Sequence, residues 1–165
     1  MKAALYEKYG PPEVVQIREV EKPVPKNDEV LVKIFATTVN RTDCGFRKPE
    51  YPVIIRLTNG LFTPKQKILG SEFAGIVEAI GNNVKAFRIS DEVFGLTGNR
   101  FGAHAECICL LENGAIEIKP GNFNFKEAAG LISTMRLFSS TTKMRSSIFC
   151  IRMFFASGLI SNNLN

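Results

Sequence analysis

Residues 68–95, ILGSEFAGIVEAIGNNVKAFRISDEVFG, carry the pattern that decides the fold. Between Phe73 and Ile80, apolar and small residues recur with the rhythm of a β-strand. Gly81 and the two asparagines after it are residue types that tolerate a positive φ, as tight turns require. The stretch therefore predicts a strand, a tight turn and a second strand, which together make a β-hairpin.

Glycine recurs in and just beyond this stretch, at Gly70, Gly75, Gly81, Gly95 and Gly98. The residues between these glycines are largely apolar and are expected to pack closely. In such surroundings glycine favours bulges, corners and the close approach of two backbones over simple flexibility. The composition is typical of a small, strongly bent barrel.

The flanking sequence continues the β pattern. Residues 14–20 (VVQIREV) alternate apolar and polar side chains, which predicts a half-buried strand. Residues 29–40 (EVLVKIFATTVN) form the longest β-rich run. This run places four apolar residues on one face, namely Val30, Val32, Ile34 and Ala36. Residues 101–111 and 115–119 predict two further strands.

Helices are expected only at the periphery. A polar turn after residue 40 opens a short helix over about residues 42–47. Asn124 is a suitable N-cap with Glu127 at the third helical position, so a second short helix is predicted over residues 124–131. The predicted fold is mainly β, a partly open antiparallel barrel, followed by a C-terminal tail without a predicted fold.

Length and charge narrow the possible functions. A chain of 165 residues with 45% hydrophobic and 22% charged residues predicts one globular domain plus an appendage. Of its 21 basic residues four follow Glu127, where no acidic residue occurs, so the first 131 residues carry 17 basic against 16 acidic groups. Basic and acidic side chains alternate in this part, which argues against a nucleic-acid-binding face.

The ends of the chain and its cysteines indicate a cytoplasmic protein. The opening MKAALYEKYG lacks the apolar run of a secretory signal. The apolar stretch 148–160 is interrupted by Arg152 and is too short for a bilayer of about 30 Å, although an amphipathic segment on a membrane surface is an alternative. The four cysteines are interpreted as packing residues that stay reduced: Cys44, Cys107, Cys109 and Cys150.

Four segments occur in a characteristic order: KAALYEKYGPPEVVQI (2–17), EVLVKIFATTVNRTD (29–43), ILGSEFAGIVEAIG (68–81) and FGAHAECICL (101–110). Together they resemble the N-terminal GroES-like catalytic domain of the medium-chain dehydrogenase/reductase superfamily. The nearest branch is the zinc-independent one, with quinone oxidoreductases and proteins described as NAD(P)-dependent alcohol dehydrogenases. The resemblance covers residues 1–131 and implies an NAD(P)H-dependent oxidoreductase acting on a small carbonyl or quinone substrate.

The resemblance also bears on metal binding. In zinc-dependent members a Cys stands where Asn40 stands and a His where Ser71 stands, and an amide and a hydroxyl are weak zinc ligands. Cys44 lies four residues past the ligand position, and His104, the only histidine, is interpreted as a packing or surface residue. Glu72 is interpreted as a structural carboxylate that accepts backbone hydrogen bonds at a bend. No metal is expected.

The matching positions imply a catalytic site formed by Asn40, Asp43, Arg47 and Tyr51, with Asn40 and Tyr51 also beside the cofactor, NADP(H) or NAD(H). In such enzymes hydrogen bonds stabilise the oxyanion that develops on the substrate. Each residue has a structural alternative. Asn40 and Asp43 can cap the turn, Arg47 can be a surface charge, and Tyr51 can anchor a loop.

No G-x-G-x-x-G motif occurs in the 165 residues, and no βαβ pattern follows residue 124, where relatives continue into a dinucleotide-binding domain. Residues 132–165 instead form an atypical basic tail, interpreted as unrelated sequence such as a frameshift or read-through product. Three functions stay open. The chain is a truncated oxidoreductase that is inactive alone, a non-catalytic module that associates with itself or another protein through its exposed domain face, or a defective gene product.

Overall fold

The computed structural model describes residues 1–48 and 59–132. In this part of the chain, strands β1 (Lys2–Tyr6) and β2 (Val15–Glu19) pair as a two-stranded antiparallel sheet. A second antiparallel sheet has the strand order β6-β3-β4-β5-β7. Its strands are β3 (Glu29–Thr37), β4 (Glu72–Ile80), β5 (Glu92–Leu96), β6 (Cys107–Leu111) and β7 (Ile116–Ile118).

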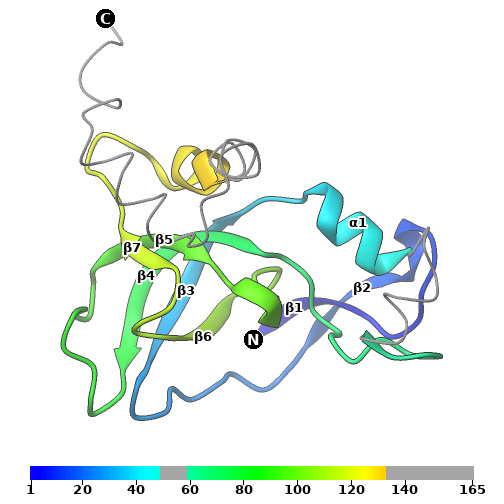
Figure 1. Ribbon diagram of the computed structural model, residues 1–165, viewed down its shortest axis with the longest axis horizontal. Coiled ribbons are helices and arrows are strands. Elements are labelled where there is room, and N and C mark those ends of the chain that lie inside the picture. The colour runs from blue at the N-terminus through cyan, green and yellow to red at the C-terminus, as the bar shows by residue number, and fades with distance from the viewer. Residues whose placement is uncertain (49–58, 133–165) are drawn as a thin grey trace, which may run out of the picture.

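Short helices surround these strands (Figure 1). They are helix α1 (Arg41–Arg47), the helical residues 125–132, and the 3₁₀ turns η1 (Pro12–Val14) and η2 (Gly98–Arg100). In Figure 1, α1 lies toward the β1–β2 sheet, whereas the helical residues 125–132 lie at the end of the main sheet where β5 and β7 are. None of the helices in the described part has the length and apolar character of a membrane crossing.

The two sheets are joined by single β-bridges, Ala3 with Ala105 and Leu5 with Ile68. They form no closed barrel within residues 1–48 and 59–132. The predicted mainly β, partly open antiparallel fold with peripheral helices is therefore confirmed.

Both faces of the main sheet are buried. Side chains that alternate along β4 pack into a separate cluster on each face. Phe73 and Val77 point into a core with Val30 and Val32, whereas Ala74 packs with Phe94 on the opposite face. That second face is covered by the helical residues 125–132 through the buried side chains of Ala128, Ala129 and Ile132. A central strand covered on both sides needs a nearly continuous apolar sequence, as residues 73–77 have.

The predicted tight turn in residues 68–95 is wrong, although β4 and β5 do pair antiparallel. The second strand begins only at Glu92, and Gly81 and the asparagines after it have no positive φ. Gly81 instead donates its N–H to Glu29 O at 2.8 Å, and a Cβ on it would lie 1.9 Å from Lys26 O. The glycine is required for close packing against residues 26–29. The connection from the end of β4 to the start of β5 is the longer segment 81–91.

The strand predicted over residues 101–111 is also only partly correct, because β6 starts at Cys107. Phe101 and Gly102 have φ values of 52° and 107°, which interrupt the extended conformation. Residues 102–104 instead donate backbone N–H groups to the Leu69 and Gly70 carbonyls, at 2.9 to 3.2 Å. This segment therefore wraps around the corner at Gly70 before it joins the sheet.

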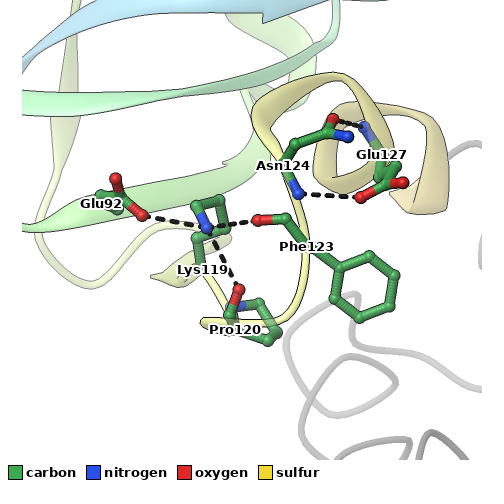
Figure 2. A network of polar contacts seen from close by, with 6 residues as sticks. All are labelled: Glu92, Lys119, Pro120, Phe123, Asn124 and Glu127. Atoms are coloured by element: carbon green, nitrogen blue, oxygen red, sulfur yellow. Dashed lines mark hydrogen bonds and ion pairs between the residues drawn. The ribbon is translucent and has the colours of Figure 1, made fainter.

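A buried lysine fixes the chain that leads into the second helix (Figure 2). Lys119 Nζ pairs with Glu92 Oε2 at 2.9 Å and donates to the carbonyls of Pro120 and Phe123 at 3.1 and 2.5 Å. Only 5% of its side chain is exposed, whereas Glu92 is about half exposed. Since a buried charge needs full compensation, the three acceptors hold the loop 119–123 in one conformation.

The predicted cap of this helix is confirmed. Asn124 N donates to Glu127 Oε2 at 2.8 Å, and Glu127 N donates to Asn124 Oδ1 at 3.0 Å (Figure 2). These reciprocal bonds satisfy two backbone donors at the start of the helix.

Candidate functional site

The candidate site lies where β3 ends and α1 begins. Because β3 and β4 are antiparallel with Thr37 opposite Phe73, the residues after β3 meet the residues before β4. Asn40 therefore comes beside Gly70 and Ser71, although they are about thirty residues apart in the sequence. The sheet register brings these two segments together at one corner.

Asn40 and Asp43 start α1 with a capping box. Asn40 Oδ1 accepts the N–H groups of Thr42 and Asp43 at 2.9 and 3.3 Å, and Asp43 Oδ2 accepts Asn40 N–H at 2.9 Å. Both side chains thus satisfy backbone donors of the first helical turn. The structural role considered for Asn40 and Asp43, capping of the turn, is therefore present in the structure.

Asp43 does more than cap the helix. Its Oδ1 accepts the backbone N–H of Gly70 at 2.9 Å, and only 3% of the residue is exposed. Gly70 has a φ of 94°, and a Cβ there would lie 2.6 Å from His104 N, so the corner that presents this N–H requires glycine. Asp43 thereby connects α1 to the start of β4.

The two positions matched to metal ligands contact each other directly. Asn40 Nδ2 donates to Ser71 Oγ at 2.9 Å, and Ser71 is only 2% exposed. An amide and a hydroxyl joined in this way are poor ligands for Zn²⁺, which favours thiolate and imidazole. The residues present do not fit a zinc site, and no group of three His, Cys, Asp or Glu side chains suited to a metal occurs in the described ranges.

Glu72 and Thr38 are hydrogen-bonded to each other next to this corner. The hydroxyl of Thr38 donates to Glu72 Oε2, and Thr37 Oγ1 donates to the Glu72 carbonyl at 2.7 Å. Glu72 is 1% exposed, as expected for a structural carboxylate. One partner of this carboxylate is the Thr38 hydroxyl, whereas the sequence predicted backbone N–H groups. His104 Nε2 donates to Thr38 O at 3.1 Å.

Arg47 lies at the other end of α1. Its Nη1 donates to Gly10 O at 2.8 Å, and Gly10 N donates back to Arg47 O at 3.0 Å. Seven residues separate it from Asn40, which is about 10 Å along a helix, so the two side chains do not meet at one point. Tyr51 lies outside the described residues.

A groove of about 750 Å³ opens beside α1. It lies between the β1–β2 sheet, the end of β3 and the segment 103–106. Of the predicted site residues, Asp43 and Arg47 line it, together with Cys44 and His104. Its other walls are mostly apolar, with Val15, Ile17, Ile34, Phe35, Val39 and Leu69 among them.

Sequence patterns did not reveal several of these partners. The Asp43 contact to Gly70 and the His104 contact to Thr38 join segments 27 and 66 residues apart. The sequence pattern predicted a strand over residues 115–119 but did not indicate that Lys119 is buried, although lysine is rarely buried. The glycines that recur in residues 70–98 were the signal that pointed to corners, and Gly70 does turn the chain with a φ of 94°.

Residues 26–134 match the model of the alcohol dehydrogenase GroES-like domain. Human quinone oxidoreductase is 31% identical over 132 residues, which is 79% of this chain and 37% of that protein. The tomato (Solanum lycopersicum) 2-methylene-furan-3-one reductase is 34% identical over 139 residues, 79% of this chain and 34% of that protein.

Solved structures give the same picture. The quinone oxidoreductase of Coxiella burnetii superimposes with a TM-score of 0.70 at 27% identity, over 85% of this chain and 45% of that one. Escherichia coli quinone oxidoreductase complexed with NADPH gives a TM-score of 0.72 at 25% identity, over 87% and 41%. The chain thus spans less than half the length of these relatives.

Proposed function

Because the chain belongs to the alcohol dehydrogenase GroES-like domain family, we propose that residues 1–131 are the substrate-side domain of an NAD(P)H-dependent oxidoreductase of the quinone reductase type. In this proposal residues 132–165 are a separate basic tail. The observation that carries it is the Asn40 side chain, which is held between the start of α1 and Ser71. A polar group fixed in advance at a strand end is what stabilisation of a developing charge requires.

The proposed roles follow from the contacts. An amide has two N–H donors, and Ser71 takes one of those of Asn40, so the second can donate to a substrate oxygen. Both carboxylate oxygens of Asp43 accept backbone N–H groups, and we therefore assign it a positioning role. Arg47 and Tyr51 are proposed to line the substrate side of the site, and Asn40 and Tyr51 its cofactor side.

The nicotinamide cofactor supplies a hydride to the substrate carbon when it is bound. The 165 residues carry no G-x-G-x-x-G turn, the motif that holds the phosphates of a dinucleotide at a helix N-terminus. The residues present do not fit the whole cofactor. We therefore propose that activity needs a nucleotide-binding domain in addition to residues 1–131. Residues 1–131 are proposed to be inactive alone.

A fusion experiment tests the function. Residues 1–131 are joined to the remainder of a similar quinone oxidoreductase, and NADPH-dependent quinone reduction is measured. We expect turnover that falls about a hundredfold in Asn40→Ala, as loss of one oxyanion donor typically does. Val24→Ala, at a position that is 83% exposed, is the control and should retain activity. A fusion that folds but reduces no quinone would reject the proposal.

The unfused 165-residue chain should bind no NADPH in calorimetry and contain no stoichiometric zinc by elemental analysis. Saturable micromolar NADPH binding, or one zinc per chain after chelator-free purification, would contradict these expectations. We place the protein in the cytoplasm, where the thiols of Cys44, Cys107 and Cys109, which are free in the structure, would stay reduced.

A further inference from the structure

Asparagine followed by glycine occurs twice in the 165 residues, at Asn59-Gly60 and at Asn113-Gly114. Asparagine is chemically labile in this context, because the backbone nitrogen of the next residue can attack the carbon of the side-chain amide. Glycine has no Cβ to hinder this attack, and its backbone rotates freely. The sequence gives both pairs the same reactivity, so the structure decides whether they differ.

Asn113-Gly114 lies in the turn between β6 and β7, where Asn113 is exposed. Gly114 N donates to Leu111 O at 2.9 Å, which closes a β-turn with Asn113 at its third position. The Asn113 side chain has no hydrogen-bond partner among residues 1–48 and 59–132. Attack by the Gly114 nitrogen therefore requires only that one hydrogen bond of a surface turn opens, and such openings are frequent.

The other pair is held firmly in place. Asn59 is only 4% exposed, its Nδ2 donates to Tyr6 Oη at 3.3 Å, and its Oδ1 accepts the N–H of Gln66 at 3.3 Å. Gly60 has a φ of 116°, and its carbonyl accepts the Tyr9 hydroxyl at 2.8 Å. The Asn59 amide cannot turn toward the Gly60 nitrogen until several of these hydrogen bonds break, which opens a buried part of the domain.

We propose that Asn113 is a deamidation site of the folded protein, whereas Asn59 is protected. In the first step Gly114 N bonds to Asn113 Cγ, the Cγ–Nδ2 bond breaks, and ammonia leaves with the proton of Gly114 N. Water then opens the succinimide ring that results. Opening at the Cγ carbonyl gives aspartate, and opening at the main-chain carbonyl of Asn113 gives isoaspartate. This modification is independent of the oxidoreductase chemistry proposed above.

The residues on both sides of Asn113 are anchored to other segments. Glu112 donates its N–H to Asp28 O at 2.9 Å, and its Oε1 accepts both backbone N–H groups of residues 85–86. Ala115 O accepts a backbone N–H from the end of β5 at 2.8 Å. The turn is therefore exposed at Asn113 but fixed on either side of it.

The same turn connects the two edges of the main sheet. The strand order places β6 at one edge and β7 at the other, and residues 112–115 carry the chain between them. An isoaspartate adds one methylene to the main chain within this connection. The anchored neighbours on its two sides then cannot both keep their partners. We expect the converted protein to lose stability for this reason.

The first experiment compares the two pairs in the full 165-residue chain. The chain is kept in mildly alkaline buffer, once folded and once unfolded in urea, and mass spectrometry of its peptides follows each asparagine. In urea both pairs should convert at similar rates. In the folded chain Asn113 should convert at least about a hundredfold faster than Asn59, because several hydrogen bonds must open at Asn59. Conversion of Asn59 as fast as Asn113, or an Asn113 that stays intact while the unfolded chain converts, would overturn the proposal.

A second experiment measures the consequence of the isoaspartate, which an isoaspartyl methyltransferase distinguishes from aspartate. After full conversion of Asn113, urea denaturation should show the ratio of folded to unfolded chain lowered about tenfold, as loss of one or two hydrogen bonds would do. Asn113→Gln, which forms the cyclic intermediate far more slowly, should keep its stability through the same incubation. Asn113→Asp, measured fresh, adds the charge without the methylene and should stay close to the unmodified chain. A converted chain as stable as Asn113→Gln would show that the turn accommodates isoaspartate and would reject the expected loosening.

Discussion

The two helix starts of this domain use the same capping device in different surroundings. Asn40 and Asp43 form one capping box, and Asn124 and Glu127 form the other. In the first box Asp43 is buried and Asn40 half-buried, and the two bond onward to Gly70 and Ser71, whereas Asn124 and Glu127 bond each other at an exposed position. The same residue pattern therefore makes a junction between distant segments in one place and a local cap in the other.

A second difference lies in how each helix is anchored. At α1 the capping aspartate itself reaches the neighbouring segment. At the second helix a separate residue, Lys119, holds the preceding loop to β5 through Glu92 (Figure 2). Capping and anchoring are thus combined in one side chain at the candidate site and divided between two elsewhere.

The largest effect is expected for Asp43→Ala. This change leaves the half-buried N–H of Asn40 and the buried N–H of Gly70 without their acceptor, which costs about 4 kcal/mol of unfolding free energy at one to three per orphaned group. Urea denaturation followed by circular dichroism measures it. Asp43→Asn keeps one acceptor and should cost less. A loss no greater than that of Glu127→Ala would show that burial adds nothing to the first box.

Lys119→Met is expected to come next. The methionine keeps the apolar stem but removes the donor to the Pro120 and Phe123 carbonyls and the partner of Glu92. We expect a loss of about 3 kcal/mol, since hydrogen bonds to charged groups contribute about 1.5 to 3 each. Lys126→Met, a lysine exposed at the start of the same helix, is the control. Equal stability of the two variants would remove the anchoring role from Lys119.

Asn40→Ala removes both a cap and a long-range contact. The cap contributes about 1 kcal/mol and the bond to Ser71 about 1 more, so a total loss of about 2 kcal/mol is expected. A double-mutant cycle with Ser71→Ala, analysed by urea denaturation, isolates the contact. Strict additivity of the two single changes would show that Asn40 acts only as a cap.

The smallest effect is expected for Asn124→Ala, which removes only an exposed cap. Its loss should be about 1 kcal/mol, the usual value for an N-cap replaced by alanine. Asn124→Ser keeps a capping oxygen and should restore most of it. If Asn124→Ala instead matches or exceeds Asn40→Ala, the contrast between an exposed and a buried box is wrong.

Much of the fold was predictable because its signals are local. The one-face pattern of residues 29–40 predicted β3, and the pairs Asn40–Asp43 and Asn124–Glu127 marked both helix starts. The predictions failed where a distant segment decides the conformation. Gly81 was expected to turn with a positive φ, yet it serves the approach of residues 26–29.

At the candidate site too, the sequence named the residues, and only the structure showed their contacts. Asn40, Asp43 and Arg47 were named from sequence motifs, but only the structure showed that Asp43 is buried between two backbone donors and that Arg47 faces a groove apart from Asn40. The catalytic roles of these residues and of Tyr51 stay predictions.

By itself the sequence determined most of the strands, the helix caps, the family and the lack of good zinc ligands at Asn40 and Ser71. These properties depend on side-chain chemistry and on neighbours within a few residues. Only the tertiary structure decided that Asn40 meets Ser71, that Lys119 is buried and that α1 borders a groove. Those contacts depend on sheet register and packing between segments far apart in the chain, which no local pattern encodes.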